Sequence, residues 1–210
     1  MATNYDTIAS SYDLIRKIVL GNSIVKAQVG LLKFIPANSR ILIVGGGTGW
    51  ILEEISAIYS EGLQIDYVES SAKMIRLSQK RNHRSNEITY IHQPIEIYTT
   101  DKIYDVIITP FLFDNFQIDK IAIIFAKLNR YLNKDGVWLY ADFVYDETHG
   151  PLWQKILLKI MYFFFRVTCK IETQEIVNMD QFFTTLYYPV FTTSYYHNFI
   201  QSIAYRKQIN

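Results

Sequence analysis

The chain is poor in cysteine and in net charge, and each shortage excludes a class of protein. Cys169 is the one cysteine among 210 residues, so no intramolecular disulfide can form, which fits a reducing cytoplasm. A net charge of +1 predicts no strong attraction to nucleic acid or to acidic membranes. The four histidines are scattered and show no zinc or iron pattern. We therefore expect a cytoplasmic protein without a metal or a nucleic-acid partner, and we expect no membrane contact.

Apolar and aromatic residues, by contrast, are plentiful. Half of the residues are hydrophobic and 20% are charged, which is the composition of a folded chain with a substantial core. A length of 210 residues suits one α/β domain. The 16 Tyr, 13 Phe and 3 Trp concentrate after residue 151 and predict either an aromatic-rich core or a bulky apolar cavity. Residues 1–11 lack the basic start and the apolar core of a signal peptide.

The most informative motif is a glycine-rich turn that directly follows an apolar segment. Residues 41–44 are all aliphatic, which is typical of a strand in a parallel sheet covered on both faces. Glycines after such a strand allow a sharp turn and a close approach of the backbone to a ligand. The turn consists of Gly45, Gly46, Gly47, Thr48 and Gly49.

An acidic residue stands at the distance expected for binding a ribose. Glu69 lies twenty residues after Gly49 and ends a second apolar segment, residues 63–68. Strand, glycine turn, helix, strand and terminal acid together form a nucleoside-binding unit. Trp50 stands where a dinucleotide-binding fold needs its third glycine. The spacing therefore disfavours NAD as the ligand.

Helical and strand-like segments alternate along the chain, which predicts a doubly wound parallel sheet in an α/β fold. Ser23 is the expected N-cap of the first well-defined helix. Strands are expected at residues 41–44, 64–68, 88–92, 104–109 and 137–144, and helices at 24–34, 50–59, 72–79, 119–132, 151–168 and 180–188. Residues 191–196 and 200–207 lie too close in sequence for a parallel crossover, so they predict a terminal antiparallel hairpin.

These motifs resemble motif I of the class I S-adenosylmethionine (SAM) dependent methyltransferases, in which an apolar strand runs into Gly-x-Gly-Thr-Gly. The motifs are similar to those of small bacterial members related to the quinone and small-molecule methyltransferases. The resemblance implies SAM as cofactor and a Rossmann-like seven-stranded sheet in the order 3-2-1-4-5-7-6. It implies one domain over residues 1–210, with a helical arm (1–35), a SAM-binding half (36–147), a helical cap (148–190) and the hairpin (191–207).

Chemistry and resemblance together nominate the residues that contact SAM. The turn amides, at a helix N-terminus, can face the methionyl group, where an anion gains about 0.3–1 kcal/mol. The Glu69 carboxylate can accept hydrogen bonds from both ribose hydroxyls. The resemblance implies a methionine beneath the adenine and a tyrosine that closes over the methionyl end. The resulting set is Gly45, Gly46, Gly47, Thr48, Gly49, Glu69, Ser70, Met74, Gln93, Ile95, Thr109 and Tyr12.

Some of these positions have an alternative or depart from the family pattern. Met74 equally suits a core position on a helix, and Tyr12, with Tyr5 as second candidate, equally suits packing of a surface arm. Ile43 stands where the family carries an acid, and Pro94 stands where an Asp often approaches the adenine amine. Gln93 can replace that Asp, and the Ile95 amide can reach the adenine.

No residue stands out as a catalytic base. Residues 109–116 follow the fourth strand and are expected to cover the site as an apolar loop, because ligands bind at the carboxyl edge of such sheets. Asp114 is the ionisable group of this loop and a weak candidate for a base or a substrate contact. His149 is a second weak candidate, for which a loop histidine without a catalytic role is the favoured alternative.

The segment 152–166 combines a polar stripe with many apolar residues. The stripe consists of Lys155, Lys159, Tyr162 and Arg166, spaced by four, three and four residues, so it is expected to form one wetted edge of a helix. The apolar remainder is too short to span a bilayer. A lid over the acceptor cavity with inward aromatic side chains is the favoured interpretation, followed by a dimer interface and by a membrane-surface helix.

The sequence thus predicts an enzyme that transfers a methyl group from SAM to a small, largely apolar acceptor. A non-catalytic protein that binds SAM or a partner on the same fold is the first alternative. An NAD-linked oxidoreductase is less favoured because of Trp50. The oligomeric state is open between monomer and dimer.

Overall fold

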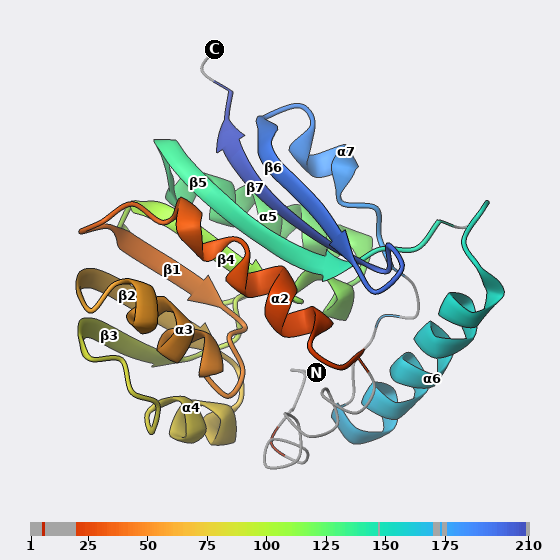
Figure 1. Ribbon diagram of the computed structural model, residues 1–210, viewed down its shortest axis with the longest axis horizontal. Helices are drawn as coiled ribbons and strands as arrows, with labels where there is room; N and C mark the ends of the chain where they lie inside the picture. Colours follow the sequence, from red (N-terminus) through yellow and green to blue (C-terminus); the bar gives the residue numbers. More distant parts are fainter. Residues whose placement is uncertain (1–5, 7–19, 147, 170–172, 174–175, 209–210) are drawn as a thin grey trace.

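The computed structural model describes residues 6, 20–146, 148–169, 173 and 176–208, which fold around one mixed sheet (Figure 1). The strands are β1 (Arg40–Val44), β2 (Glu61–Glu69), β3 (Ser85–His92), β4 (Tyr104–Pro110), β5 (Leu132–Phe143), β6 (Tyr187–Tyr195) and β7 (Ile200–Lys207). The helices are α2 (Ser23–Val29), α3 (Trp50–Ile58), α4 (Ala72–Ser78), α5 (Ile118–Tyr131), α6 (Leu152–Cys169) and α7 (Asp180–Phe183). Short 3-10 turns, η2 and η3, occupy Leu32–Phe34 and Phe113–Asn115.

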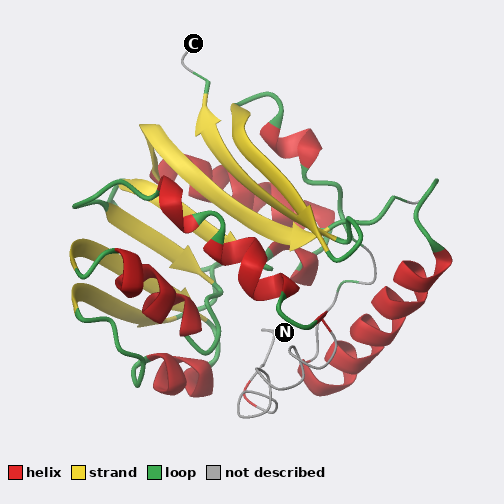
Figure 2. Ribbon diagram, viewed as in Figure 1, coloured by secondary structure: helices red, strands yellow, loops and turns green. Residues whose placement is uncertain are grey.

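The sheet has seven strands in the order β3-β2-β1-β4-β5-β7-β6. Strands β1 to β5 pair in parallel, whereas β7 pairs antiparallel with both β5 and β6. The predicted fold class, strand order and terminal hairpin are therefore confirmed. In Figure 2 the carboxyl ends of the parallel strands point toward one edge of the sheet, where loops gather.

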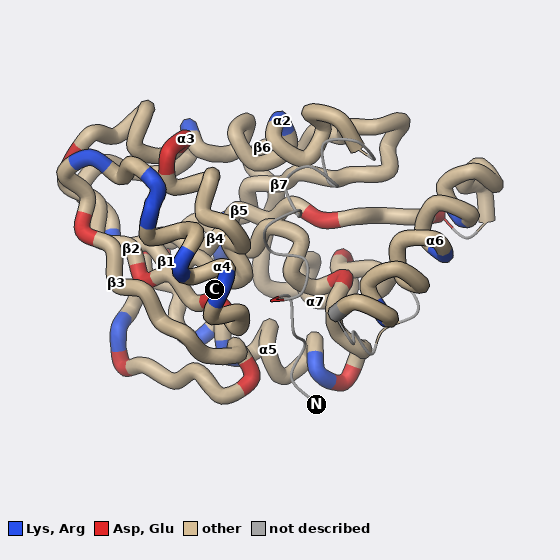
Figure 3. The backbone as a smooth tube through the Cα atoms, turned by 90° about the horizontal axis from the view of Figure 1, so that it is seen from below, with Lys and Arg blue, Asp and Glu red and all other residues tan. Residues whose placement is uncertain are grey.

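Helices cover both faces of the sheet, as the all-apolar β1 segment requires. Ile41 and Ile43 face a core that includes α2 and α3, whereas Leu42 and Val44 face a second core beneath α5. Figure 3 shows α2 and α3 on one side of the strands and α5 on the other. Because Ile43 is fully buried in the first core, the position where the family carries an acid serves packing in this chain.

The aromatic residues mainly form a core rather than a cavity. Phe125 stacks on Trp138 with ring centroids 5.0 Å apart, and Phe183 stacks on Tyr205 at 4.1 Å. Tyr187 packs edge-on against Trp138 at 5.7 Å. These residues belong to one buried core and none of them lines the pocket described below, which favours packing as the explanation of the aromatic content.

Several element boundaries differ from the predicted ones. Ser23 is the first residue of α2 rather than its N-cap, and that position belongs to Asn22, whose side chain makes no capping bond. The first helix also stops at Val29 instead of reaching Phe34. Strand β5 begins at Leu132, which places the expected loop residues 133–136 in the sheet.

The chain near the hairpin also differs. Helix α7 ends at Phe183, because the residues from Tyr187 join β6 instead of continuing the helix. Pro189 lies within β6, which is the edge strand, where a residue that lacks an N–H is tolerated.

Candidate cofactor site

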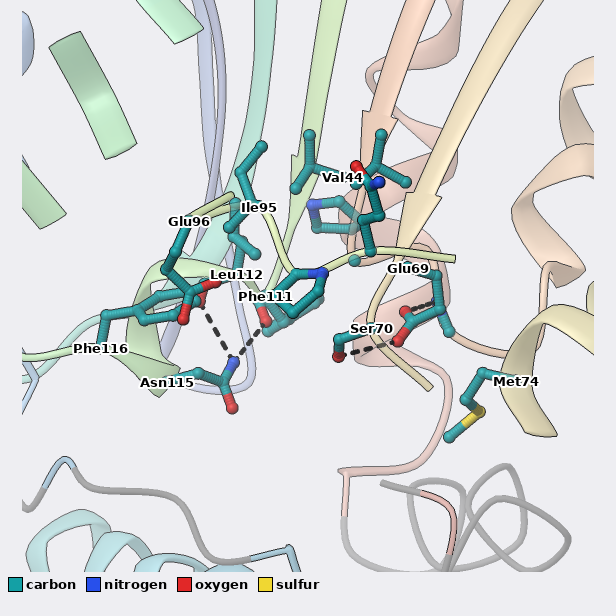
Figure 4. Close-up of a pocket in the computed structure, with 16 residues that line it drawn as sticks. Val44, Glu69, Ser70, Met74, Ile95, Glu96, Phe111, Leu112, Asn115 and Phe116 are labelled. Atoms are coloured by element: carbon teal, nitrogen blue, oxygen red, sulfur yellow. Dashed lines mark hydrogen bonds between the residues drawn. The ribbon is translucent and has the colours of Figure 1, made fainter. Parts of the chain in front are cut away.

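A pocket opens at the carboxyl ends of β1, β2 and β4 (Figure 4). Glu69 and Met74 lie on one side of it, and Phe111, Asn115 and Phe116 lie across from them. The pocket is lined by Val44, Gly45, Gly47, Val68, Glu69, Ser70, Met74, Gln93, Pro94, Ile95, Glu96, Pro110, Phe111, Leu112, Asn115 and Phe116. The structure thus brings together seven nominated residues, which are Gly45, Gly47, Glu69, Ser70, Met74, Gln93 and Ile95.

Glu69 is the one buried carboxylate among the nominated residues, and it holds the glycine turn in place. Its Oε2 accepts a hydrogen bond from the Gly47 amide at 3.1 Å. Its Oε1 accepts from the Ser71 amide at 2.9 Å and from the Ser70 hydroxyl at 3.3 Å. Burial raises the pKa of Glu69, and these hydrogen bonds partly offset the rise.

A carboxylate can accept about four hydrogen bonds, and three are already made inside the protein. Two ribose hydroxyls therefore need one internal donor to move away. The Ser70 hydroxyl makes the longest of the three bonds and belongs to a rotatable side chain. We therefore expect the Ser70 side chain to rotate away from Glu69 when the ribose binds, while the Gly47 and Ser71 amides keep their hydrogen bonds to it.

The glycines of the turn serve different purposes. Gly45, Gly47 and Gly49 have φ angles of +72°, +63° and +77°, which side chains with a Cβ adopt at a cost. A Cβ on Gly46 would lie 2.4 Å from the Tyr67 ring, and one on Gly49 would lie 2.4 Å from the Ser78 Cβ. At Gly47 nothing lies within 4 Å of that position. Gly46 and Gly49 therefore serve packing, and Gly47 leaves open space where a ligand can approach.

The turn amides differ from the expectation that they face the methionyl group. The Gly45 amide donates to the Val68 carbonyl at 2.9 Å, and the Gly49 amide donates to the Gly46 carbonyl at 3.3 Å. The Gly47 amide is held by Glu69. Because these three amides donate inside the protein, they are not free to donate to a ligand. The turn therefore favours ligand binding mainly through its open shape and the positive end of helix α3.

The wall after β3 is held by a buried lysine that the sequence analysis missed. Lys127 on α5 is only 9% exposed. Its Nζ donates to the Ile95 carbonyl at 3.0 Å and to the Glu96 carbonyl at 2.7 Å. Burial lowers the pKa of Lys127. The sequence indicated this lysine only as one charged residue on an otherwise apolar helix face. The partners of Lys127 are backbone carbonyl oxygens, which no sequence pattern specifies.

The opposite wall is the apolar loop after β4, as expected. Phe111 has a φ of +52°, which is an uncommon conformation for an aromatic residue. Its amide donates to the Ala141 carbonyl at 2.7 Å, and this bond fixes the turn. Asp142 at the end of β5 accepts from the Phe113 amide at 3.0 Å and so ties the loop to the sheet.

Asp142 and Asp114 form a pair of carboxyl groups beside the pocket. Asp142 is 1% exposed, and burial raises its pKa to about 7 despite hydrogen bonds from backbone amides. Burial, with the nearby Asp142 charge as second cause, raises the pKa of Asp114 well above its ordinary range. Asp114 accepts a hydrogen bond from the Asn115 side chain at 2.7 Å. Asp114 thus lies next to Asn115, a lining residue, and burial favours the protonated forms of both carboxyl groups.

Replacing Asp114 with Asn is expected to stabilise the fold at high pH. A raised folded-state pKa means that ionisation costs stability once the pH exceeds the ordinary value of 3.8. Asp114→Asn removes this cost but keeps the oxygen that accepts from Asn115. The variant and the parent should have the same Tm near pH 4. At pH 8 the Tm of the variant should be higher, by about 2–4 °C for each ~1 kcal/mol of unfolding free energy that it gains.

Thermal melts over that pH range test the prediction, with Asp135→Asn as a control because Asp135 is exposed. A difference between Asp114→Asn and the parent that stays constant with pH would show that Asp114 ionises normally in the fold.

Among the described residues, Gly46, Thr48, Gly49, Thr109 and His149 were also nominated but do not line the pocket. Thr48 is buried, and its carbonyl accepts from the Arg81 side chain at 3.0 Å. Thr109 is fully buried, and its hydroxyl accepts from the Trp138 indole at 2.9 Å. The His149 side chain is 83% exposed and pairs with Asp146 at 3.4 Å. Tyr12 and Tyr5 lie outside the described residues.

Within residues 6, 20–146, 148–169, 173 and 176–208, no three His, Cys, Asp or Glu side chains gather as metal ligands. Over the same part of the chain, every helix is too short or too polar to cross a bilayer.

A glycine turn, an acid at the end of β2 and a sheet with an antiparallel β7 define a nucleoside-binding α/β protein of the methyltransferase type. Residues 41–136 match the family model described as "Methyltransferase domain". This match, together with the strand order, supports the predicted resemblance to the class I SAM-dependent methyltransferases and SAM as the cofactor.

Curated relatives share the central part of the chain. A malonyl-[acyl-carrier protein] O-methyltransferase of Bacillus cytotoxicus is 30% identical over 116 residues, which are 54% of this chain and 39% of that protein. Its counterpart from Bacillus cereus is 29% identical over 117 residues, again 54% of this chain and 42% of the relative. The chain thus spans about two fifths of the length of these relatives.

Solved structures share the whole fold at low identity. A DhpI complex with S-adenosylhomocysteine aligns with a TM-score of 0.69 at 14% identity, over 97% of this chain and 93% of that one. The mitomycin 7-O-methyltransferase MmcR aligns with a TM-score of 0.68 at 13% identity, over 95% of this chain and 58% of that one. At such identity the likeness concerns the fold.

Proposed function

We propose that the protein transfers a methyl group from SAM to a small, largely apolar acceptor. The observation that carries the proposal is the placement of Glu69 and the open side of Gly47 in one pocket. A buried acid beside an open glycine turn is what a ribose and a methionyl group require. The family match over residues 41–136 supports the same conclusion.

The residues of the pocket divide into a nucleoside side and an acceptor side. Glu69 binds the ribose, and Met74 and Ile95 supply apolar surface for the adenine. When bound, SAM would supply a methyl group on a positively charged sulfur: an acceptor O, N or C attacks the methyl carbon in line, the carbon–sulfur bond breaks, and S-adenosylhomocysteine is the leaving group. Phe111, Leu112 and Phe116 form the wall opposite Glu69 and exclude water from the acceptor. Positioning of this kind can contribute roughly 7–11 kcal/mol to lowering the barrier.

An apolar acceptor suits this wall, because the wall offers aromatic and aliphatic surface for the acceptor to pack against. A base is needed only for an acceptor that arrives protonated. Asp114, beside the lining residue Asn115, remains the candidate for that role, although burial raises its pKa and so favours the form that already carries a proton. The exposed His149, paired with Asp146, is a poorer candidate.

The curated relatives are named for methylating a malonyl group carried by a protein. A short carboxylic acyl group is therefore one acceptor to include in a screen beside apolar phenols and amines. The alternatives, a non-catalytic SAM-binding protein and an NAD-linked oxidoreductase, make different predictions in the same assay. The first binds SAM without turnover, and the second binds NAD in competition with SAM.

Calorimetry and a turnover assay distinguish these functions. We expect SAM and S-adenosylhomocysteine to bind and NAD not to compete. With a panel of acceptors, formation of S-adenosylhomocysteine should depend on the acceptor. Binding of SAM with no turnover on any acceptor of the panel would favour the non-catalytic alternative, and failure to bind SAM would refute the proposal.

A further inference from the structure

Helix α6 presents a continuous apolar stripe to the outside. Leu152, Ile156, Ile160, Phe163 and Val167 are 71%, 50%, 60%, 65% and 67% exposed. Their spacing of four, four, three and four residues places them on one helix face. At 1.5 Å per residue the stripe is about 22 Å long. Trp153, which is 41% exposed, adjoins its first turn.

The opposite face of α6 holds the helix to the rest of the protein. Leu158 and Tyr162 are each 7% exposed and belong to the core that includes α2 and α3. The Gln154 side chain donates to the His197 carbonyl at 2.9 Å. Tyr162 thus lies inside rather than on the expected wetted edge. Because α6 packs through this face, the outward stripe is not needed to attach it.

The outward stripe also differs from the predicted lid. No lining residue of the described pocket comes from α6. Phe163 points to the outside, and Phe164 and Phe165 are half-buried against the first core. In Figure 1 the helix stands beyond the carboxyl ends of the parallel strands, apart from the sheet.

The charges on α6 are all positive and lie along one side of the stripe. Its basic residues are Lys155, Lys159 and Arg166, and its sequence contains no Asp or Glu. At 100° per residue these three positions fall within about 40° of one another, next to the stripe. Lys159 and Arg166 are exposed, and Lys155 is half-buried. A surface that is apolar and negatively charged would complement this face.

We propose that α6 binds an anionic lipid surface, lying flat with the stripe among the acyl chains and Lys159 and Arg166 at the phosphates. Interfacial helices carry this combination of an apolar face, a Trp or Phe side chain and flanking Lys and Arg. A second copy of the chain is less well matched, because α6 has no acidic residue to pair with the basic residues of its counterpart. The proposal is independent of methyl transfer, since vesicle binding requires neither SAM nor an acceptor.

Co-sedimentation with vesicles tests the proposal with the full chain. One vesicle contains phosphatidylcholine alone, and the other is an equimolar mixture with phosphatidylglycerol. We expect binding to the anionic vesicles at low salt, weaker binding at high salt, and a blue shift of Trp fluorescence. The pair Ile160→Glu and Phe163→Glu should reduce binding at least tenfold. Each of Lys159→Gln and Arg166→Gln should reduce it about fivefold.

Matched controls separate the stripe from a general loss of structure. Ile123 on α5 is 65% exposed, so Ile123→Glu changes an equally exposed apolar residue elsewhere and should leave binding unchanged. Lys80→Gln and Lys134→Gln are the controls for the loss of one positive charge, because both lysines are exposed and lie outside α6. Neither variant should change vesicle binding. Circular dichroism and thermal melts should be alike for all these variants, since every altered side chain is exposed.

Three results would overturn the proposal. The parent protein could fail to bind anionic vesicles at low salt, or the stripe pair could bind them as the parent does. Sedimentation could also show that the parent is a dimer in the presence and absence of vesicles, and that the double variant with Ile160→Glu and Phe163→Glu is a monomer. That last result would assign the stripe to a second copy of the chain.

Discussion

Replacing Glu69 with alanine is expected to weaken SAM binding at least about tenfold. Two ribose hydroxyls would lose a charged acceptor, and each such bond contributes about 1.5–3 kcal/mol. The Gly47 and Ser71 amides would also lose their partner, so the turn itself would loosen. Calorimetric titration with SAM and with S-adenosylhomocysteine gives the affinity ratio directly.

The pH dependence of binding adds a second readout for the same residue. Burial raises the pKa of Glu69, and the ionised form is the better acceptor. SAM affinity should therefore fall on acidification at a higher pH than an ordinary carboxyl would produce. Glu69→Gln retains one acceptor oxygen, so its affinity should be intermediate and independent of pH in this range.

Glu61→Ala is the matched control, because Glu61 is an exposed acid at the start of the same strand. It should bind SAM as the parent does. If Glu69→Ala binds SAM with undiminished affinity and melts normally, the ribose assignment is wrong and the acid serves only to hold the turn.

Much of the fold could be predicted because its cause is local. The aliphatic run before Gly45 needs cover on both faces, and alternation of helices and strands then implies a parallel sheet. The ends of elements were less predictable. Strand β5 begins at Leu132 because residues there pair with β4 at Tyr104, and such a contact between distant segments has no local pattern.

The site was predictable where a backbone conformation or a charge is required. Gly47 and Glu69 are such positions, and both line the pocket. Thr109 follows the same strand-end logic, yet it is turned to the Trp138 indole in the core. The direction of one side chain at a strand end depends on what packs against it. For the same reason Lys127 escaped notice, since its partners are carbonyl oxygens of a distant loop.

The two middle glycines of the turn are expected to respond differently to alanine, with the main effect on stability at Gly46 and on SAM affinity at Gly47, which is the sharpest test of the assigned roles. Gly46→Ala places a methyl group 2.4 Å from the ring of Tyr67, which is fully buried and donates to the Gly47 carbonyl at 2.9 Å. Overpacking of this kind costs about 1–3 kcal/mol. Thermal melts should therefore show a Tm lowered by several degrees, at about 2–4 °C per kcal/mol.

Gly47→Ala meets no atom within 4 Å, so its cost to stability is the cost of a positive φ alone, about 1 kcal/mol. Gly21→Ala measures that cost by itself, because Gly21 has a φ of +57°, equally open surroundings and no place in the pocket lining. The two variants should melt alike, whereas only Gly47→Ala should lose SAM affinity, by at least about tenfold, because its methyl group occupies the space reserved for the ligand. If Gly47→Ala and Gly21→Ala bind SAM equally well, the open side of Gly47 does not face the cofactor, and the pocket must bind it through Glu69 and the loop after β4 alone.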